Sequence, residues 1–212
     1  MALPRRLALI GNLVPPDAVL YDIGADRGLF SMAFSQKGYK VYAGENKKGP
    51  YQSLVFSLNE NRSSVLPLFS DGITVLPEDV DTLVILGMGG GTIEHILSAY
   101  PEKMKQIKTL ILEPQSQTDL SVLAANRLGF INDAGFYVLE KRYYPAMRFV
   151  RGKEKLSDME IAFGPYPFRN KDPLLIESLR KKALLIASRR GKGLPVSNKD
   201  LFEEEALRKI SD

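Results

Sequence analysis

The sequence predicts an α/β fold, in which a seven-stranded, mostly parallel sheet is followed by a small C-terminal α-helical domain. Along residues 18–128, short apolar segments of strand length alternate with helical segments, a spacing typical of βαβ units. Two segments that alternate apolar and polar residues follow, as antiparallel strands do. After Gly164-Pro165-Tyr166-Pro167 the pattern becomes helical. We therefore predict one domain over residues 1–165 and a helical hairpin over residues 166–212.

The elements follow in order from local signals. Arg5 to Leu13 is an amphipathic segment that Pro15-Pro16 stops, so we expect a short helix there. The apolar runs that we expect to be parallel strands are 18–23, 39–43, 65–69, 82–86 and 109–112. The expected helices between them are 28–36, 50–61, 92–99 and 118–128. Pro50 suits a first helical turn and Gly129 a helix end.

The C-terminal third is expected to contain two antiparallel strands and then two helices. Residues 136–141 and 147–151 show the alternation of half-buried strands. Residues 174–188 and 200–210 have helical patterns, and a turn rich in Gly, Pro and Asn joins them.

Composition excludes several kinds of chemistry. The 212 residues include no Cys and a single His, His95, which excludes disulfides, thiolate nucleophiles, Cys-ligated zinc and His-rich metal sites. We expect no metal. No run approaches 18 apolar residues, so we expect no membrane span. The apolar stretch 7–14 contains Asn12 and lacks a small-residue cleavage site, so we interpret it as a helix rather than a signal peptide. The prediction is a cytoplasmic protein that is a monomer or weak dimer.

The net charge of +4 is unevenly distributed. Residues 1–165 carry 18 basic and 18 acidic side chains, whereas residues 166–212 carry 11 basic and 7 acidic ones. A compact basic surface attracts polyanions, which favours nucleic-acid binding by the tail. The alternative is a solvated helical face that the acidic patch Glu203-Glu204-Glu205 partly balances.

Glycine-rich and acidic motifs follow four of the expected parallel strands, at the edge where such sheets bind ligands. The motifs are Asp22-Ile-Gly24-Ala-Asp26-Arg-Gly28, Gly44-Glu45, Ser70-Asp71-Gly72 and Gly87-Met88-Gly89-Gly90-Gly91. Glycine lets the backbone approach a ligand closely because no Cβ intervenes. A carboxylate at Glu45 can accept two hydrogen bonds from a ribose diol. Each motif alone is weak evidence, since tight turns also need glycine, but together they predict a cofactor site.

Asp26 discriminates between two cofactor classes. The dinucleotide fingerprint needs G-x-G-x-x-G so that a helix N-terminus meets a pyrophosphate. Here the spacing is Gly24-x-x-x-Gly28, and Asp26 occupies the position of the middle glycine. A carboxylate would repel a pyrophosphate but suits an ammonium or sulfonium group. The motifs therefore predict a methyltransferase with S-adenosyl-L-methionine as cofactor, and Asp71 paired with the adenine amino group. A dehydrogenase is the least favoured alternative.

With these motifs the sequence resembles the bacterial tRNA (adenine-22, N1)-methyltransferase family, often called TrmK, over nearly the whole chain. The shared features are an N-terminal Arg-Leu helix, Val14-Pro15-Pro16-Asp17-Ala18, Asp22-Ile-Gly24-Ala-Asp26, Gly44-Glu45 with Gly49-Pro50, Asp71-Gly72, Gly87-Met88-Gly89-Gly90, Leu110-Ile-Leu-Glu113-Pro114-Gln115 and Gly164-Pro165. The resemblance implies a Rossmann-like class I methyltransferase fold and methylation of N1 of an adenine, adenine 22, in tRNA. It also implies that the helical tail helps to hold tRNA.

Three positions depart from the family pattern. Arg27 stands where the family usually has His, Glu113-Pro114-Gln115 replaces Gln-Pro-Asn, and Met147 replaces a Tyr. We expect these positions near the pocket for the target base. One alternative is therefore a family member that binds S-adenosyl-L-methionine and tRNA with a lost or altered reaction. A small-molecule methyltransferase is another, although it leaves the basic tail unexplained.

The resemblance and the motifs together assign roles to individual residues. The predicted cofactor-binding residues are Asp22, Gly24, Asp26, Gly28, Glu45, Asp71, Gly72, Gly87, Met88 and Gly89. The predicted catalytic residues are Asp26, Glu113 and Arg27. The predicted tRNA contacts are Arg180, Lys181, Lys182, Arg189, Arg190 and Lys192, mainly to the RNA backbone.

Each catalytic assignment has a structural alternative. Neutral adenine N1 needs no deprotonation, and its methylated product is cationic, so a nearby carboxylate should stabilise the developing charge. Asp26 contacts either the methionine ammonium of the cofactor or the amino group of the target adenine. Glu113 could instead be an acid at a helix N-terminus. Arg27 could bind a phosphate or form an ion pair with Asp26, and the ion pair is the favoured interpretation. Met88 or Tyr51 could pack on the target base, although core packing is the more common role of such side chains. His95 is expected to be structural.

Overall fold

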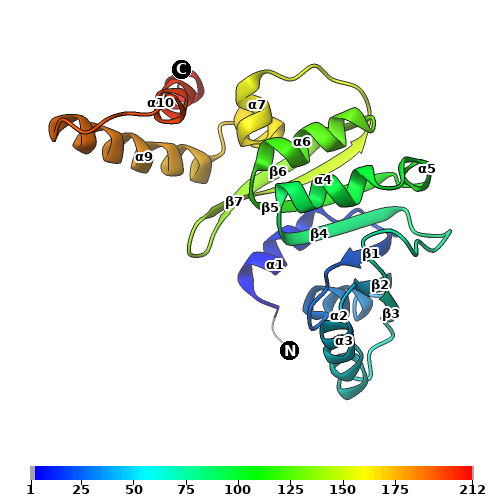
Figure 1. Ribbon diagram of the computed structural model, residues 1–212. Coiled ribbons are helices and arrows are strands. Elements are labelled where there is room, and N and C mark those ends of the chain that lie inside the picture. Colours follow the sequence, from blue (N-terminus) through cyan, green and yellow to red (C-terminus); the bar gives the residue numbers. More distant parts are fainter. Residues whose placement is uncertain (1–2, 212) are drawn as a thin grey trace.

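The sheet has seven strands in the order β3-β2-β1-β4-β5-β7-β6 (Figure 1), in a computed structural model that describes residues 3–211. The strands are β1 (Val19–Ile23), β2 (Lys40–Glu45), β3 (Leu66–Phe69), β4 (Thr82–Gly89), β5 (Thr109–Ser116), β6 (Phe130–Leu139) and β7 (Tyr143–Arg151). Strands β1 to β5 pair in parallel, and β7 runs antiparallel to both β5 and β6. The predicted α/β class, the strand number and the final antiparallel pair are confirmed.

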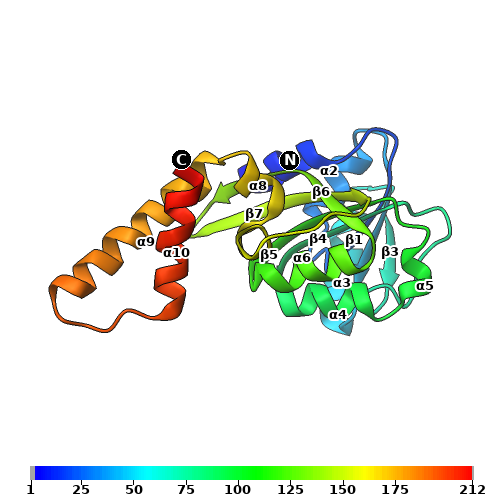
Figure 2. The ribbon, with the colours of Figure 1, turned by 90° about the horizontal axis from the view of Figure 1, so that it is seen from above.

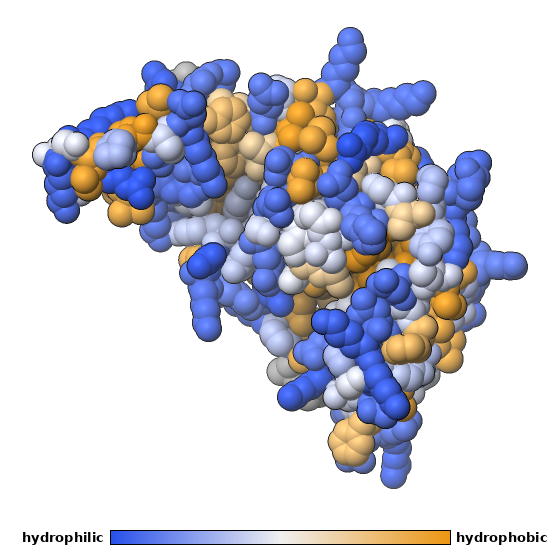
Figure 3. Space-filling model, in the orientation of Figure 1, coloured by the Kyte–Doolittle hydropathy of each residue, from blue (hydrophilic) through white to orange (hydrophobic). Residues whose placement is uncertain are grey.

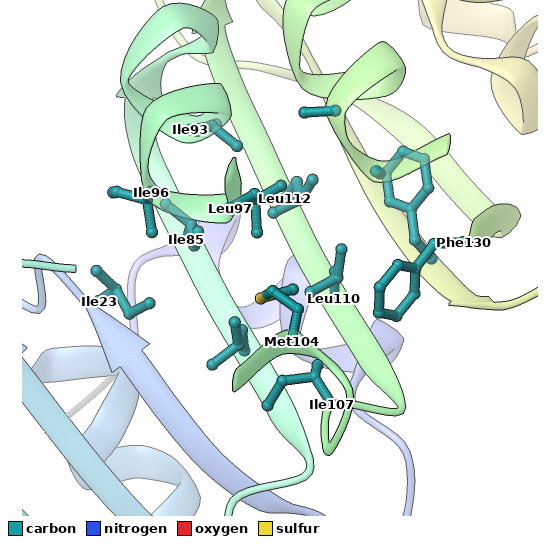
Figure 4. Close-up of a cluster of buried hydrophobic side chains, with 14 of the residues drawn as sticks. Ile23, Ile85, Ile93, Ile96, Leu97, Met104, Ile107, Leu110, Leu112 and Phe130 are labelled. Carbon is teal, nitrogen blue, oxygen red and sulfur yellow. The ribbon is translucent and has the colours of Figure 1, made fainter. Parts of the chain in front are cut away.

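Helices cover both faces of the sheet. One face carries α4 (Gly90–Ser98), α5 (Pro101–Met104) and α6 (Thr118–Arg127), and the other carries α1 (Arg5–Ile10), the 3₁₀ helix η1 (Gly11–Leu13), α2 (Leu29–Ser35) and α3 (Lys48–Glu60). Figure 4 shows Ile93 and Leu97 of α4 packed toward Leu110 and Leu112 of β5. Branched aliphatic side chains on the central strands fill the space between the layers, because parallel strands are buried on both faces.

The chain order places the carboxyl ends of β1 and β4 side by side. Strand β1 pairs with β2 on one side and with β4 on the other. The connections from β1 and from β4 therefore leave in opposite directions along the sheet, which creates the crevice where open α/β sheets bind ligands. The glycine-rich motifs that follow these two strands lie at this edge.

Several boundaries differ from the sequence-based expectation. Strands β4 and β5 continue through Gly89 and Ser116, where we expected loops, because each strand pairs with the other up to that point. Strand β6 begins at Phe130, directly after Gly129 ends α6. Helices α7 (Asp158–Phe163) and α8 (Pro165–Arg169) were not expected. The capping box of Ser157 and Glu160 is a local signal that could have identified α7.

The C-terminal tail is a hairpin of α9 (Pro173–Gly191) and α10 (Asn198–Ser211) that projects from the sheet domain (Figure 2). It packs through an apolar cluster that joins Leu175, Leu179 and Ala206 to Tyr137 of β6 and Phe163 of α7. This cluster crosses the expected boundary between residues 165 and 166. The tail is thus anchored on side chains of the preceding domain.

The tail surface mixes apolar and polar side chains (Figure 3), with Leu184 72% exposed on α9. Within residues 3–211, no helix combines the length and apolar character that crossing a bilayer requires. The same residues contain no cluster of three or more His, Cys, Asp or Glu side chains arranged to hold a metal ion.

Candidate functional site

Asp22 ends β1 and anchors the first glycine loop to the helix that follows it. Its carboxylate is buried and accepts a hydrogen bond from Ser31 Oγ of α2 at 2.6 Å. Burial raises the pKa of Asp22 from its ordinary 3.8 to about 6, the Ser31 hydrogen bond opposes this shift, and the charge of Glu45 adds to it. The predicted cofactor residue therefore lies beneath the loop, where it fixes the loop's position.

Asp26 and Arg27 form the exposed tip of this loop. The backbone of Asp26 is in the left-handed region, with φ 52°, and its N–H donates to Glu45 Oε1 at 2.7 Å. Among the described residues neither Asp26 nor Arg27 forms an ion pair, so the expected pair between them is wrong. Both side chains extend toward solvent, because the turn separates them.

Two glycines of the loop have different roles. Gly24 has φ +74°, and a Cβ there would lie 2.2 Å from Met88 Cε. The Met88 side chain, half-buried at the end of β4, thus crosses the loop at its first glycine. Gly28 has φ +71°, and a Cβ there would lie 2.9 Å from Leu54 Cδ1 of α3. Gly28 is buried, so its missing side chain lets α2 and α3 pack together.

Carboxylates also end β2 and β3. Glu45 is half-buried, Asp71 is exposed, and Asn46 Nδ2 donates to Asp71 Oδ1 at 2.9 Å. Gly72 is buried, and its carbonyl accepts a hydrogen bond from the Tyr21 hydroxyl at 2.9 Å. With Asp22 and Asp26, this edge carries four carboxylates from the ends of three neighbouring strands. Such a cluster favours a cationic ligand over an anionic one.

The Gly87-Met88-Gly89 segment is the irregular end of β4. Its register on β5 shifts on both sides of Met88, which pairs with Pro114, while Gly89 pairs with Ser116. Gly87 has φ +76°, a conformation that favours glycine. Its N–H donates to Glu113 Oε2 at 2.9 Å. Glu113, on β5, therefore holds the end of the neighbouring strand.

Glu113 is fully buried under an arginine from the N-terminal helix. Arg6 Nη1 lies 2.6 Å from Glu113 Oε2, and Arg6 Nε lies 3.2 Å from Glu140 Oε1. Burial raises the pKa of Glu113, and the Arg6 charge opposes this shift. Its Oε1 atom has no hydrogen-bond partner among the described residues. The alternative interpretation of Glu113 as a helix N-terminal acid is wrong, because it lies within β5.

The remaining pocket candidates occupy different environments. Tyr51 packs edge-on against Phe69, with ring centroids 5.4 Å apart. His95 lies on the exposed surface of α4. Met147 is fully buried in the sheet core. Its register partner on β5 is Leu112, the residue before Glu113, so Met147 lies within the sheet beside that second departure from the family pattern.

Most of the predicted tRNA contacts in the tail already have acidic partners. The ion pairs are Lys181–Glu177, Lys182–Glu203, Arg189–Asp200 and Arg190–Glu204. Arg180 and Lys192 are exposed and form no ion pair within residues 3–211. Four of the six predicted contact residues therefore have a carboxylate beside them, which lowers their attraction for an RNA phosphate.

The sequence did not reveal the residues that surround Glu113 or the closeness of the β6–β7 turn to the tail. Arg6 and Glu140 flank Glu113, yet each lies far from it along the chain. Arg6 belongs to the N-terminal Arg-Leu helix, but that motif does not indicate a contact with Glu113, and Glu140 belongs to no recognised motif. The turn of the β6–β7 hairpin, with Lys141 and Arg142, also lies near the tail (Figures 1 and 2). The local signal for this turn in the sequence is a pair of adjacent cations between two segments that alternate apolar and polar residues.

Comparison with known proteins gives matches over much or all of the chain. Residues 3–146 match the family described as "Methyltransferase domain". The chain is 31% identical over 119 residues to tRNA (adenine(22)-N(1))-methyltransferase of Bacillus subtilis (strain 168), covering 54% of this chain and 50% of that protein. The alignment thus spans about half the length of this curated relative.

Two solved structures resemble the whole chain. One is a protein in the NADB-Rossmann superfamily from Streptococcus agalactiae, with TM-score 0.86, 27% identity, and coverage of 100% of this chain and 96% of that one. The other is Streptococcus pneumoniae Sp1610 in complex with S-adenosyl-L-methionine, with TM-score 0.84, 24% identity, and coverage of 99% and 98%. The helical tail is included in both matches.

Proposed function

This chain belongs to the methyltransferase-domain family, and from that premise we propose that it transfers a methyl group from S-adenosyl-L-methionine to N1 of an adenine in tRNA, adenine 22. The observation that carries the proposal is the row of carboxylates at the ends of β1, β2 and β3, next to the glycine-rich end of β4. The tRNA target is supported by the Bacillus subtilis relative.

The residues present fit this cofactor. S-adenosyl-L-methionine supplies a methyl group on a positively charged sulfonium centre. In this proposal Asp26 faces the cationic end, Glu45 accepts the ribose hydroxyls, and Asp71 accepts from the adenine amino group. The proposed backbone contacts are Gly24, Gly28, Gly72, Gly87, Met88 and Gly89, while Asp22 supports the loop from below. A pyrophosphate cofactor is disfavoured because it would meet the carboxylates of Asp26, Glu45 and Asp71.

The catalytic work is mainly positioning and electrostatics. Adenine N1 carries its own lone pair, so the protein needs no general base, and it must instead align the base and exclude water. We propose that Asp26 stabilises the positive charge that develops on the adenine ring. Arg27, exposed beside it, is proposed to bind an RNA phosphate. Glu113 is fully buried, so we propose that it acts through Gly87 as a positioning residue.

We propose residues 1–165 as the cofactor-binding domain and residues 166–212 as a tail that binds tRNA. N1 lies on the Watson–Crick edge, so a paired target must be exposed from its stack. The tail would hold the RNA backbone, with Arg180 and Lys192 free to contact phosphates. Lys181, Lys182, Arg189 and Arg190 would exchange part of their present ion pairing for RNA contacts.

A methyl-transfer assay with unmodified tRNA tests the proposal. We expect Asp26→Ala and Glu45→Ala to lower the rate at least tenfold, because each removes a carboxylate from the cofactor edge. Glu60→Ala is the matched control, since Glu60 is an exposed acid at the last residue of α3. Wild-type activity in both site variants would contradict the site assignment.

One observation favours a second candidate, a protein that binds S-adenosyl-L-methionine and tRNA without the adenine reaction. Glu113, at the position of the family Gln, is buried and paired with Arg6, so it presents no polar group to a base. Binding of both molecules with no product would support this candidate.

A further inference from the structure

A cleft of about 820 Å³ separates the end of β5 from the helical tail. One wall consists of residues 114–119, at the end of β5 and the start of α6. The turn of the β6–β7 hairpin, residues 141–145, forms the second wall, and α9 and α10 form the third. In Figure 2 the tip of the β6–β7 hairpin lies beside α10. The volume lies within the range of ligand-binding sites, roughly 300–1,000 Å³.

The cleft begins next to the proposed methyl-transfer edge. Pro114, at its inner end, pairs with Met88 across β4 and β5. The wall at Pro114 therefore lies beside the end of β4, and the opposite wall belongs to the tail. A polymer whose target residue sits at the cofactor edge would continue into this space.

The cleft wall carries unneutralised positive charge. Five cations line it against two acids, Asp119 and Glu203. Three of the cations, Lys141, Arg142 and Lys199, are exposed and form no ion pair within the described residues. The other two, Lys181 and Lys182, are paired with acids of the tail helices. An anionic ligand would therefore be attracted to the hairpin turn and to the start of α10 rather than to the middle of α9.

Two tyrosines, Tyr143 and Tyr144, line the cleft together with these cations. Tyr143 is fixed, because its hydroxyl donates to Glu177 at 2.8 Å and Lys181 Nζ lies 5.1 Å from its ring centroid. Tyr144 is half-buried, lines the cleft, and makes no side-chain hydrogen bond within the described residues. Cations interleaved with aromatic faces are the combination that binds single-stranded nucleic acid.

We propose that this cleft binds a single-stranded segment of RNA adjacent to the target adenine. Lys141, Arg142 and Lys199 contact its phosphates, and Tyr144 offers a ring face to one of its bases. The hairpin turn and the tail thus contact the RNA segment from opposite sides. This inference rests on the proposed tRNA substrate and adds to it a surface outside the tail cations that the sequence predicted.

The test measures the affinity of an unmodified tRNA transcript at several salt concentrations. The variants are Lys141→Ala/Arg142→Ala and the control Lys153→Ala/Lys155→Ala, whose two cations are exposed and unpaired within the described residues beyond the opposite end of β7. Loss of two phosphate contacts to a single strand should reduce the slope of log K against log salt by roughly 1.4. The control should keep the wild-type slope. Calorimetry with S-adenosyl-L-methionine should give the same affinity for all these proteins.

Tyr144 provides an independent readout. Loss of one stacked base should weaken tRNA binding by roughly 5- to 150-fold in Tyr144→Ala. Tyr144→Phe keeps the ring face and should bind tRNA as the wild type does.

The outcomes separate this inference from the proposed function. A wild type that binds and methylates tRNA, together with hairpin and Tyr144 variants that match it in affinity and slope, would overturn the cleft proposal alone. A wild type with no affinity for tRNA would overturn both.

Discussion

The backbone N–H of Gly87 donates a hydrogen bond to Glu113 Oε2, 2.9 Å away, and the same oxygen lies 2.6 Å from Arg6 Nη1. One carboxylate therefore connects the glycine-rich end of β4, the strand β5 and the N-terminal helix. Glu113 is fully buried, whereas the Arg6 side chain is 19% exposed. Removal of the carboxylate would leave both donors without their acceptor.

We therefore predict that Glu113→Leu lowers the free energy of unfolding by about 1–3 kcal/mol, as expected when a buried acceptor is lost while Arg6 keeps Glu140 as a partner. Glu113→Gln keeps an oxygen that can accept from Gly87, so it should be less destabilising. Urea denaturation of both variants checks this order. Equal stability of Glu113→Leu and the wild type would contradict the positioning role.

Asp22 should make stability depend on pH. Its folded pKa of about 6 lies above the ordinary 3.8, so the folded chain holds this proton more tightly than the unfolded chain does. Stability should therefore fall as the pH rises from 3.8 to about 6 and change little through this group above that. The full effect is about 3 kcal/mol, from a shift of about two pKa units.

Asp22→Asn removes the titration and keeps an oxygen that can accept from Ser31. In chemical denaturation, the free energy of unfolding of Asp22→Asn should increase relative to that of the wild type as the pH rises from 4 to 6. A difference that does not change with pH would show that Asp22 titrates normally in the folded protein.

Gly24→Ala should be more damaging than an alanine at another left-handed glycine. Gly38 has φ +92°, and no atom lies within 4 Å of where its Cβ would be. Gly38→Ala therefore reports the backbone cost alone, about 1–2 kcal/mol. Gly24→Ala adds the collision with Met88, so it should be less stable and should bind S-adenosyl-L-methionine more weakly.

Met88→Ala in the Gly24→Ala background removes the colliding methyl group and should restore part of the lost stability. Thermal unfolding of the single and double variants measures this coupling. If the effects of the two substitutions on stability were strictly additive, Met88 would not occupy the space beside Gly24.

Alanine substitutions of Lys182 and Arg180 should differ in their effects on stability and tRNA binding, although both residues are tail cations. Lys182 pairs with Glu203, whose side chain is only 8% exposed, so Lys182→Ala leaves a buried carboxylate unpaired. We expect a loss of about 1–3 kcal/mol in stability. Arg180→Ala should change stability by less than about 0.5 kcal/mol and weaken tRNA binding. The opposite pattern in unfolding and binding experiments would refute this division of roles.

The succession of strands and helices along the chain could be predicted from the sequence because it depends on local patterns. Apolar runs such as 82–86 identify buried strands, and Asp26 within a glycine loop predicts a cationic ligand. The C-terminal ends of β4 and β5 could not be predicted, because Gly87 and Pro114 are poor strand residues. Pro114 is in the sheet through its pairing with Met88, and Gly87 lies in the irregularity just before that pair.

The surroundings of the site were harder to predict, because they depend on contacts between distant residues. Arg6 and Glu113 lie 107 positions apart, and no local pattern indicates that they meet. The three ion pairs between α9 and α10 have the same origin. The basic α9 and the acidic patch were visible in the sequence, but which of their residues meet depends on how the two helices pack. The cleft beside Lys141 and Arg142 likewise requires the hairpin and the tail to be brought together.

The central claim is tested most directly by mass spectrometry of nucleosides from unmodified tRNA incubated with the protein and S-adenosyl-L-methionine. The account predicts 1-methyladenosine, with the modification mapped to adenine 22 and absent when adenine 22 is replaced by another base. A different methylated nucleoside, or no methylated product from a protein that binds both molecules, would contradict it.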